Sequence, residues 1–189
     1  LNEGGQSATG SLIDHIIKNN TAYSDMVKAA KTQGTDIYGY LNRILDDLIL
    51  NRGLEIFDTR HVLPDYHGNR SPRADATAKG MVSGLTLNVS PEEVAVWYGA
   101  TIQAIAYGTR HILEEMNAQG YSVEQIYMCG GHLKNDFFIQ EHATITGCQV
   151  IIPGETEAVL LGSAILATVA AGKYQNIFDA MKSRILPLF

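Results

Sequence analysis

Residues 126–131 join a short apolar run to a pair of glycines, Gly130 and Gly131, and a helix-like pattern follows at once. Glycine has no Cβ, so backbone N–H groups at such a turn can approach a ligand closely. The start of the next helix adds unpaired N–H donors and the positive end of its dipole. A strand, a glycine turn and a helix N-terminus together suit a nucleotide or another anion. The same pattern also serves packing alone, so the turn by itself leaves both interpretations open.

The second half of the chain alternates helix and strand patterns. A strong helix start stands at Ser90-Pro91, since serine suits the N-cap and proline the first helical position, and Glu93 completes a capping box. From there we expect a helix to about residue 118, strands at 124–129 and 148–152, and helices at 134–146, 156–171 and 175–184. This alternation predicts an α/β domain with helices packed against a sheet.

The first half reads as helices followed by irregular chain. After a glycine-rich loop, Ser11 and Asp14 fit a capping box, and the helical period that follows breaks near Asn19-Asn20. A further helix is expected over residues 36–51, ended by Gly53. Residues 54–75 have the composition of extended chain and turns, and residues 81–87 fit no single pattern.

Composition excludes several classes of protein. The 189 residues suffice for one domain with a real core, and the net charge of −6 with no basic run argues against a nucleic-acid partner. The longest apolar stretch, residues 159–171, is too short and too interrupted to cross a membrane. No signal peptide is recognised, so we expect a cytoplasmic protein with Cys129 and Cys148 reduced in its core.

Two motif types fail on inspection. Residues 5–11 have the glycine spacing of a phosphate-binding P-loop, but they lack its lysine and no strand precedes them. The six histidines show no metal-ligand spacing, so we interpret them as ordinary surface or core residues and expect no metal site.

Several segments, in order, resemble the C-terminal domain of the FGGY carbohydrate kinases, the group of glycerol, xylulose and ribulose kinases. The resemblance covers nearly the whole chain and is closest to the pentulose kinases. The segments that carry it are E-G-G-Q-S-A-T-G at residues 3–10, P at 64 with G-N-R-S-P at 68–72, G-L-T at 84–86, I-A-Y-G-T-R at 105–110, G-G-x-x-x-N at 130–135 and E-x-x-x-x-G-x-A at 157–164.

This resemblance implies an actin-like, ribonuclease-H-like ATPase fold that binds ATP, with Mg²⁺ carried on the nucleotide phosphates. Gly130 and Gly131 would lie against the nucleotide, Asn135 would contact its adenine side, and Asn88 stands where several relatives have a glycine beside the nucleotide. Glu3 matches a glutamate that contacts sugar hydroxyls. Two of these residues have plainer alternatives, since Glu3 also suits a solvated turn and Asn135 also suits a helix cap.

The resemblance also implies how the chain is divided between the sugar and the nucleotide. Residues 1–189 form one partial FGGY C-terminal domain, in which 1–10 are a sugar-side loop, 11–53 a helical segment and 54–189 the nucleotide-binding α/β part. The resemblance also implies that the catalytic aspartate and a Gly-Thr phosphate loop lie upstream of Leu1, so no catalytic base is expected in this N-terminally truncated chain.

An incomplete cleft has consequences for activity and for partners. Phosphoryl transfer needs groups that converge on one site, so we expect the isolated chain to be inactive as a sugar kinase. Small-molecule sugar and ATP are the expected ligands, and an N-terminal domain or self-association is the expected partner. Two alternatives stay open: a non-catalytic nucleotide- or sugar-binding regulatory module, and an inert proteolytic fragment.

Overall fold

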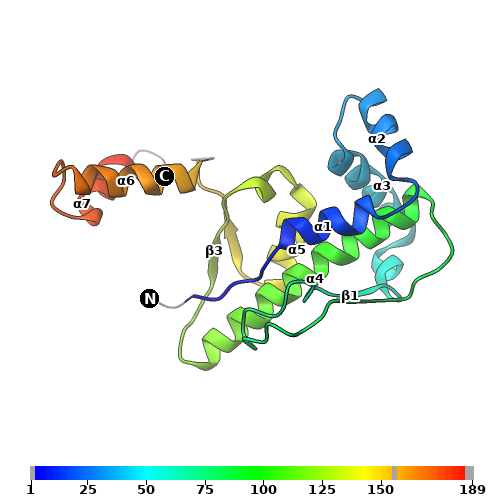
Figure 1. The fold of residues 1–189 in the computed structure, drawn as a ribbon, viewed down its shortest axis with the longest axis horizontal. Coiled ribbons are helices and arrows are strands. Elements are labelled where there is room, and N and C mark those ends of the chain that lie inside the picture. Colours follow the sequence, from blue (N-terminus) through cyan, green and yellow to red (C-terminus); the bar gives the residue numbers. More distant parts are fainter. Residues whose placement is uncertain (1–2, 155–156, 186–189) are drawn as a thin grey trace.

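The computed structural model describes residues 3–154 and 157–185 (Figure 1). In chain order the elements are α1 Thr9–Lys18, α2 Tyr23–Thr32, α3 Ile37–Arg52, the 3-10 turn η1 Leu54–Phe57, β1 His61–Leu63, β2 Met81–Ser83, α4 Pro91–Ala118, β3 Gln125–Tyr127, the 3-10 turn η2 Gly131–Lys134, α5 Asp136–Thr146, β4 Gln149–Ile151, α6 Ala158–Ala170 and α7 Ile177–Ile185. The predictions for residues 1–2 and for a helix start at residue 156 lie outside the described residues.

The long helix α4 organises the core. Apolar side chains from α1, α3 and α5 pack against it, and each fully buried side chain of this size stabilises the fold by roughly 1.5–3 kcal/mol. The most deeply buried of these side chains are Ile17, Leu41, Leu45, Tyr98, Ile102 and Ile105. The core therefore joins the first half of the chain to the second through one helix.

The predicted start of α4 is confirmed, with one difference. Pro91 begins the helix, and the hydroxyl of Ser90 accepts the backbone N–H of Glu93 over 3.3 Å. The carboxylate of Glu93 does not complete the capping box. It is buried instead, where it accepts hydrogen bonds from the guanidinium of Arg60 at 2.9 Å and from Nε1 of Trp97 at 3.1 Å.

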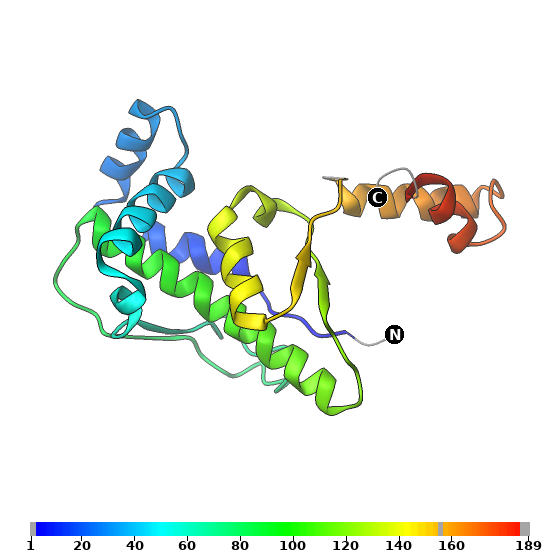
Figure 2. The same cartoon turned by 180° about the vertical axis from the view of Figure 1, so that it is seen from behind.

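The α/β class is confirmed by the second half of the chain. Strands β3 and β4 are parallel, with Ile126 opposite Val150, and α5 provides the connection between them (Figure 2). The segment that fitted no single pattern also contributes a strand, because β2 pairs antiparallel with β1 and sets Met81 opposite Leu63.

One expectation about a helix start was wrong. Helix α1 begins at Thr9 after Ala8, which has φ 61°, and no side chain caps it, because Ser11 already lies inside the helix. The stretch expected to be extended chain and turns contains the 3-10 turn η1, through which Ile56 and Phe57 bury their side chains against α3 and α4.

The expectation for the cysteines was half wrong. Both thiols are free, and Cys148 is buried, but Cys129 is exposed. Strand β3 ends at Tyr127, so Cys129 lies in the loop that leads to Gly130 rather than in the sheet.

Helices α6 and α7 extend away from the α4 core, beyond the β3–β4 sheet, in both views (Figures 1 and 2). Val159, Leu160 and Leu166 of α6 are largely exposed there. Within residues 3–154 and 157–185, none of the helices combines the length and the apolar composition needed to cross a bilayer.

Candidate functional site

A cavity of about 530 Å³ opens where three segments of the chain meet. We call it the η2 cavity. The start of α1, the loop that opens α3, and the turn η2 form its walls, and its lining residues are Gly10, Ile13, Thr35, Asp36, Tyr38, Gly39, Gly131, His132, Lys134 and Asn135. Two of the residues expected at a nucleotide, Gly131 and Asn135, therefore lie on one cavity.

The two glycines of the turn differ in their backbone conformation and in their surroundings. Gly130 has φ 96° and ψ −167°, a backbone conformation that is essentially closed to residues with a Cβ. Gly131 carries no such constraint, and a Cβ placed on it would meet no atom within 4 Å. The bare backbone of Gly131 thus faces open space at the cavity wall, where a ligand can approach it closely.

Asn135 belongs to a closed ring of side-chain hydrogen bonds with Tyr98 and Asn42. Its Nδ2 donates to the Tyr98 hydroxyl over 2.7 Å, and that hydroxyl donates to Oδ1 of Asn42 over 2.9 Å. Nδ2 of Asn42 donates back to Oδ1 of Asn135 over 3.2 Å. The ring connects α3, α4 and the start of α5, so the position of Asn135 is set by the core.

Asn135 also caps α5, which was the plainer alternative for this residue. Its Oδ1 accepts the backbone N–H of Phe138 over 3.2 Å. With the bond from Asn42, the two lone pairs of this oxygen are both used, while the amide group has two N–H donors and the ring uses one of them. A cap and a ligand contact are therefore compatible, because the second N–H has no hydrogen-bond partner among the described residues.

Tyr98 and Asn42 were not found by sequence reasoning. Tyr98 is completely buried, and burial raises the pKa of its hydroxyl, so it stays a neutral donor and acceptor at ordinary pH. Neither residue belongs to a motif. In the sequence they are a tyrosine and an asparagine on two separate predicted helices, and their spacing does not indicate that the two side chains meet.

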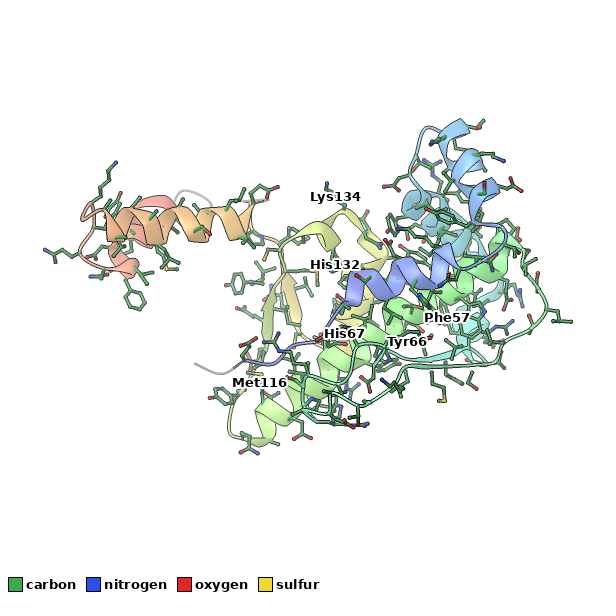
Figure 3. The ribbon with its side chains drawn as sticks, viewed as in Figure 1. Phe57, Tyr66, His67, Met116, His132 and Lys134 are labelled. Atoms are coloured by element: carbon green, nitrogen blue, oxygen red, sulfur yellow. The ribbon has the colours of Figure 1, made fainter. Side chains whose placement is uncertain are left out.

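Beside Gly131, the turn η2 contributes His132 and Lys134 to the wall of the η2 cavity (Figure 3). The ring of His132 stacks on Phe138 with 4.4 Å between centroids and 8° between planes. Burial lowers the pKa of His132, so the imidazole is neutral at neutral pH. Lys134 is exposed and supplies a positive charge at the same cavity.

A second depression, the Arg70 groove, brings together three segments that carry the family resemblance. Gln6 donates through Nε2 to the carbonyl of Ile105 and to the hydroxyl of Thr109, both over 2.9 Å. The backbone N–H of Gly5 donates to Oγ of Ser71 over 3.1 Å. The groove measures about 230 Å³, and among its lining residues are Gly5, Gln6, Ser7, Thr9, Asn69, Arg70, Ser71, Tyr107 and Gly108.

Glu3 lies beside this groove and forms an ion pair with Arg70. Both side chains are largely exposed, at 70% for Glu3 and 57% for Arg70, so water screens their attraction. Arg70 thus pairs with a carboxylate. The carboxylate of Glu3 stays open to solvent.

Asn88 lies at neither of these places. It is exposed, its Oδ1 accepts the backbone N–H of Ser90 over 3.0 Å, and it lines a cavity of about 290 Å³ with His15, Tyr66 and Trp97. The structure thus brings together Gly131 and Asn135, while Asn88 borders a different cavity.

The described residues contain no group of three or more His, Cys, Asp or Glu side chains able to hold a metal ion.

Residues 1–171 match the C-terminal domain of the FGGY family of carbohydrate kinases. The chain belongs to this family. Among curated proteins, it is 50% identical over 183 residues to an FGGY carbohydrate kinase domain-containing protein of Xenopus laevis, covering 96% of the chain and 33% of that relative. It is 36% identical to a D-ribulokinase of Saccharomyces cerevisiae (89% of the chain, 24% of the relative) and 35% identical to a ribulokinase of Bacillus licheniformis (97% and 32%).

Solved structures show the same fold at lower sequence identity. A ligand-bound xylulose kinase from Lactobacillus acidophilus aligns with a TM-score of 0.64 and 21% identity, covering 92% of the chain and 31% of that structure. A Plasmodium falciparum glycerol kinase with ADP aligns with a TM-score of 0.63 and 20% identity (94% and 31%). The fold is therefore the actin-like ATPase fold of the FGGY sugar kinases. The chain spans about a third of the length of these proteins.

Proposed function

We propose that this chain is the nucleotide-binding part of an ATP-dependent pentulose kinase of the ribulose type. The observation that carries the proposal is the arrangement of the two depressions around the first turn of α1. Thr9 lines the Arg70 groove and its neighbour Gly10 lines the η2 cavity. A sugar in the groove and a nucleotide in the cavity would approach each other at this turn, as phosphoryl transfer requires.

The nucleotide belongs in the η2 cavity. The backbone of Gly131 borders the ligand, and the second N–H of the Asn135 amide donates a hydrogen bond to the adenine base. Gly130 provides the backbone conformation that directs η2 toward the cavity. Asn88 belongs to this proposal through the family resemblance alone, because it lines a separate cavity. The named ribulokinases among the relatives favour a ketopentose as acceptor, and the ADP in the glycerol kinase structure favours an adenine nucleotide as phosphate donor.

The sugar belongs in the Arg70 groove, where the carboxylate of Glu3 accepts hydrogen bonds from sugar hydroxyls. Such bonds are charge-assisted and therefore stronger than those between neutral groups. The ion pair with Arg70 orients the carboxylate while leaving it exposed. Sugar hydroxyls can replace water on that carboxylate without breaking the pair.

The chain by itself binds nucleotide without transferring phosphate in this proposal. It spans about a third of its relatives, and the catalytic base and the phosphate loop belong to the remainder of a longer cytoplasmic polypeptide. The exposed apolar face of α6 fits contact with that remainder or with a second copy of the chain. Mg²⁺, bound through the nucleotide phosphates, would neutralise their charge.

Calorimetric titration with ADP, paired with a coupled ATP-consumption assay, tests the proposal. We expect heat of binding from ADP and no turnover with D-ribulose, L-ribulose or D-xylulose. Robust turnover by the isolated chain would overturn the assigned division of roles, and absence of ADP binding would favour an inert fragment. Pentulose-dependent turnover by the longer polypeptide separates the kinase from a non-catalytic regulatory module.

A further inference from the structure

The imidazole of His132 has a fixed place in the wall of the η2 cavity. One face of its ring stacks on Phe138, which is buried and itself stacks on His142 at 4.1 Å. On another side α1 comes close, since a side chain on Gly10 would begin 3.7 Å from Cε1 of His132. The ring is therefore held between the core and the start of α1, on the side of η2 that faces that helix (Figure 3).

The polar edge of the same ring has no partner among the described residues. Neither ring nitrogen of His132 forms a hydrogen bond there, although the ring is half buried. In the described part of the chain, no side-chain nitrogen or oxygen is buried without a hydrogen-bond partner. The two nitrogens therefore remain accessible to solvent. A ring held in place by stacking, with an accessible polar edge, suits a bound polar ligand.

Charge separates the roles of His132 and Lys134. Desolvation keeps the imidazole of His132 neutral, so it can offer one donor and one acceptor to uncharged groups. Lys134, two residues further along, is exposed and cationic. A nucleotide has a neutral part, the base and ribose, and an anionic part, the phosphates. The neutral imidazole of His132 suits the first part, and the cationic Lys134 suits the second.

We propose that His132 hydrogen-bonds the nucleoside part of the adenine nucleotide in the η2 cavity, and that Lys134 faces its phosphates. This inference rests on the proposed nucleotide site. It assigns a residue that the sequence treats as an ordinary histidine, and it makes the stack on Phe138 the element that orients the ring.

Calorimetric titration of the chain with ADP and with adenosine tests the inference. His132→Leu introduces an apolar side chain of similar bulk and removes the hydrogen bond, so we expect about tenfold weaker binding of both ligands. His132→Asn retains a donor and an acceptor and should recover part of the loss. Lys134→Met should weaken ADP binding and leave adenosine unchanged.

His67→Leu is the matched control, because His67 is exposed in the loop between β1 and β2 and lines none of the three cavities (Figure 3). It should bind both ligands as the wild type does. Unchanged binding by His132→Leu overturns the inference while the wild type still binds ADP. A loss confined to ADP overturns the nucleoside assignment. A wild-type chain that binds neither ligand overturns the proposed function, and the inference falls with it.

A measurement on the unmodified chain avoids dependence on the folding of the variants. In a histidine-labelled sample, the ring resonances of His132 should shift on addition of ADP and of adenosine, while those of His67 should not. Unshifted His132 resonances at a saturating nucleotide concentration contradict the inference.

Discussion

The side-chain amide of Asn135 donates a hydrogen bond to the hydroxyl of Tyr98 over 2.7 Å. This bond fixes a residue at the edge of the η2 cavity to a completely buried side chain of α4. The proposed nucleotide contact is therefore held in place by the core of the domain, rather than by the loop that carries it.

Tyr98→Phe tests this support. The substitution keeps the ring but removes the hydroxyl, leaving Nδ2 of Asn135 and Oδ1 of Asn42 without their shared partner. We expect the free energy of unfolding to fall by about 1–3 kcal/mol, because unsatisfied polar groups lose their hydrogen bonds without regaining water. Urea denaturation measures this change. Tyr107→Phe is the control, since Tyr107 is 58% exposed; an equal effect of both variants contradicts the role of the ring of hydrogen bonds.

The two glycines of the turn should respond differently to alanine. Gly130→Ala places a Cβ in a backbone conformation reserved for glycine, so it should destabilise the chain by about 1–2 kcal/mol. Gly131→Ala meets open space and should leave stability unchanged, but its methyl group enters the cavity and should weaken ADP binding. Thermal unfolding and ADP titration on both variants separate these effects. Loss of stability in Gly131→Ala, without loss of affinity, would reverse the assignment.

The ion pair between Arg60 and Glu93 is the main buried charge contact on α4. Glu93 is 7% exposed, and Trp97 shares its carboxylate. Arg60→Met should cost about 3 kcal/mol of unfolding free energy, because it leaves a buried carboxylate without its cation. Lys28→Met is the matched control: it breaks an exposed pair with Asp25, 2.9 Å long, and should change stability by less than about 0.5 kcal/mol. Comparable denaturation midpoints for the two variants would disprove this difference.

Stability should fall as the solution is acidified through the range where histidine titrates. Burial lowers the pKa of His142 below its ordinary value of 6.5, although Nδ1 of its ring donates to the carbonyl of Phe138. The unfolded chain therefore takes up a proton first. The stabilising contribution is complete above about pH 6.5 and is lost as the pH falls from there toward the lower pKa of the folded state.

Chemical denaturation at several pH values checks this dependence. His142→Gln removes the titrating group, so its unfolding free energy should change less between about pH 7.5 and 5.5 than that of the wild type. His132, whose pKa is also lowered by burial, keeps part of the dependence in this variant. Identical pH profiles for the variant and the wild type contradict the assignment to His142.

Local sequence signals predicted most of the helices well. Ser90 and Pro91 marked the start of α4, and Gly53 marked the residue after the end of α3, because caps and glycine stops act through neighbouring backbone atoms. The capping box at Ser11 failed because a helix can also begin without a side-chain cap, as α1 does after Ala8. A capping box indicates that a helix start at that residue is favourable, and the packing of the helix decides whether the helix begins there.

The candidate site was predictable only where one segment carries it. Gly131 and Asn135 stand four residues apart and reach the η2 cavity together. Tyr98, Asn42 and His132 take their roles from contacts between separate helices and from burial. The position of Asn88, away from the η2 cavity, is also set by how separate segments pack. Motif order along the chain identified the family, but the distances between motifs in space are set by how α1, α3 and α5 pack on α4.

Backbone amide resonances recorded during a titration with ADP test the central claim most directly. If the η2 cavity holds the nucleotide, the largest shifts will occur at Gly130, Gly131 and Asn135, with smaller changes at the start of α1. If the amides of the Arg70 groove shift instead, or if none of the turn residues responds at a saturating ADP concentration, the η2 cavity is not the nucleotide site.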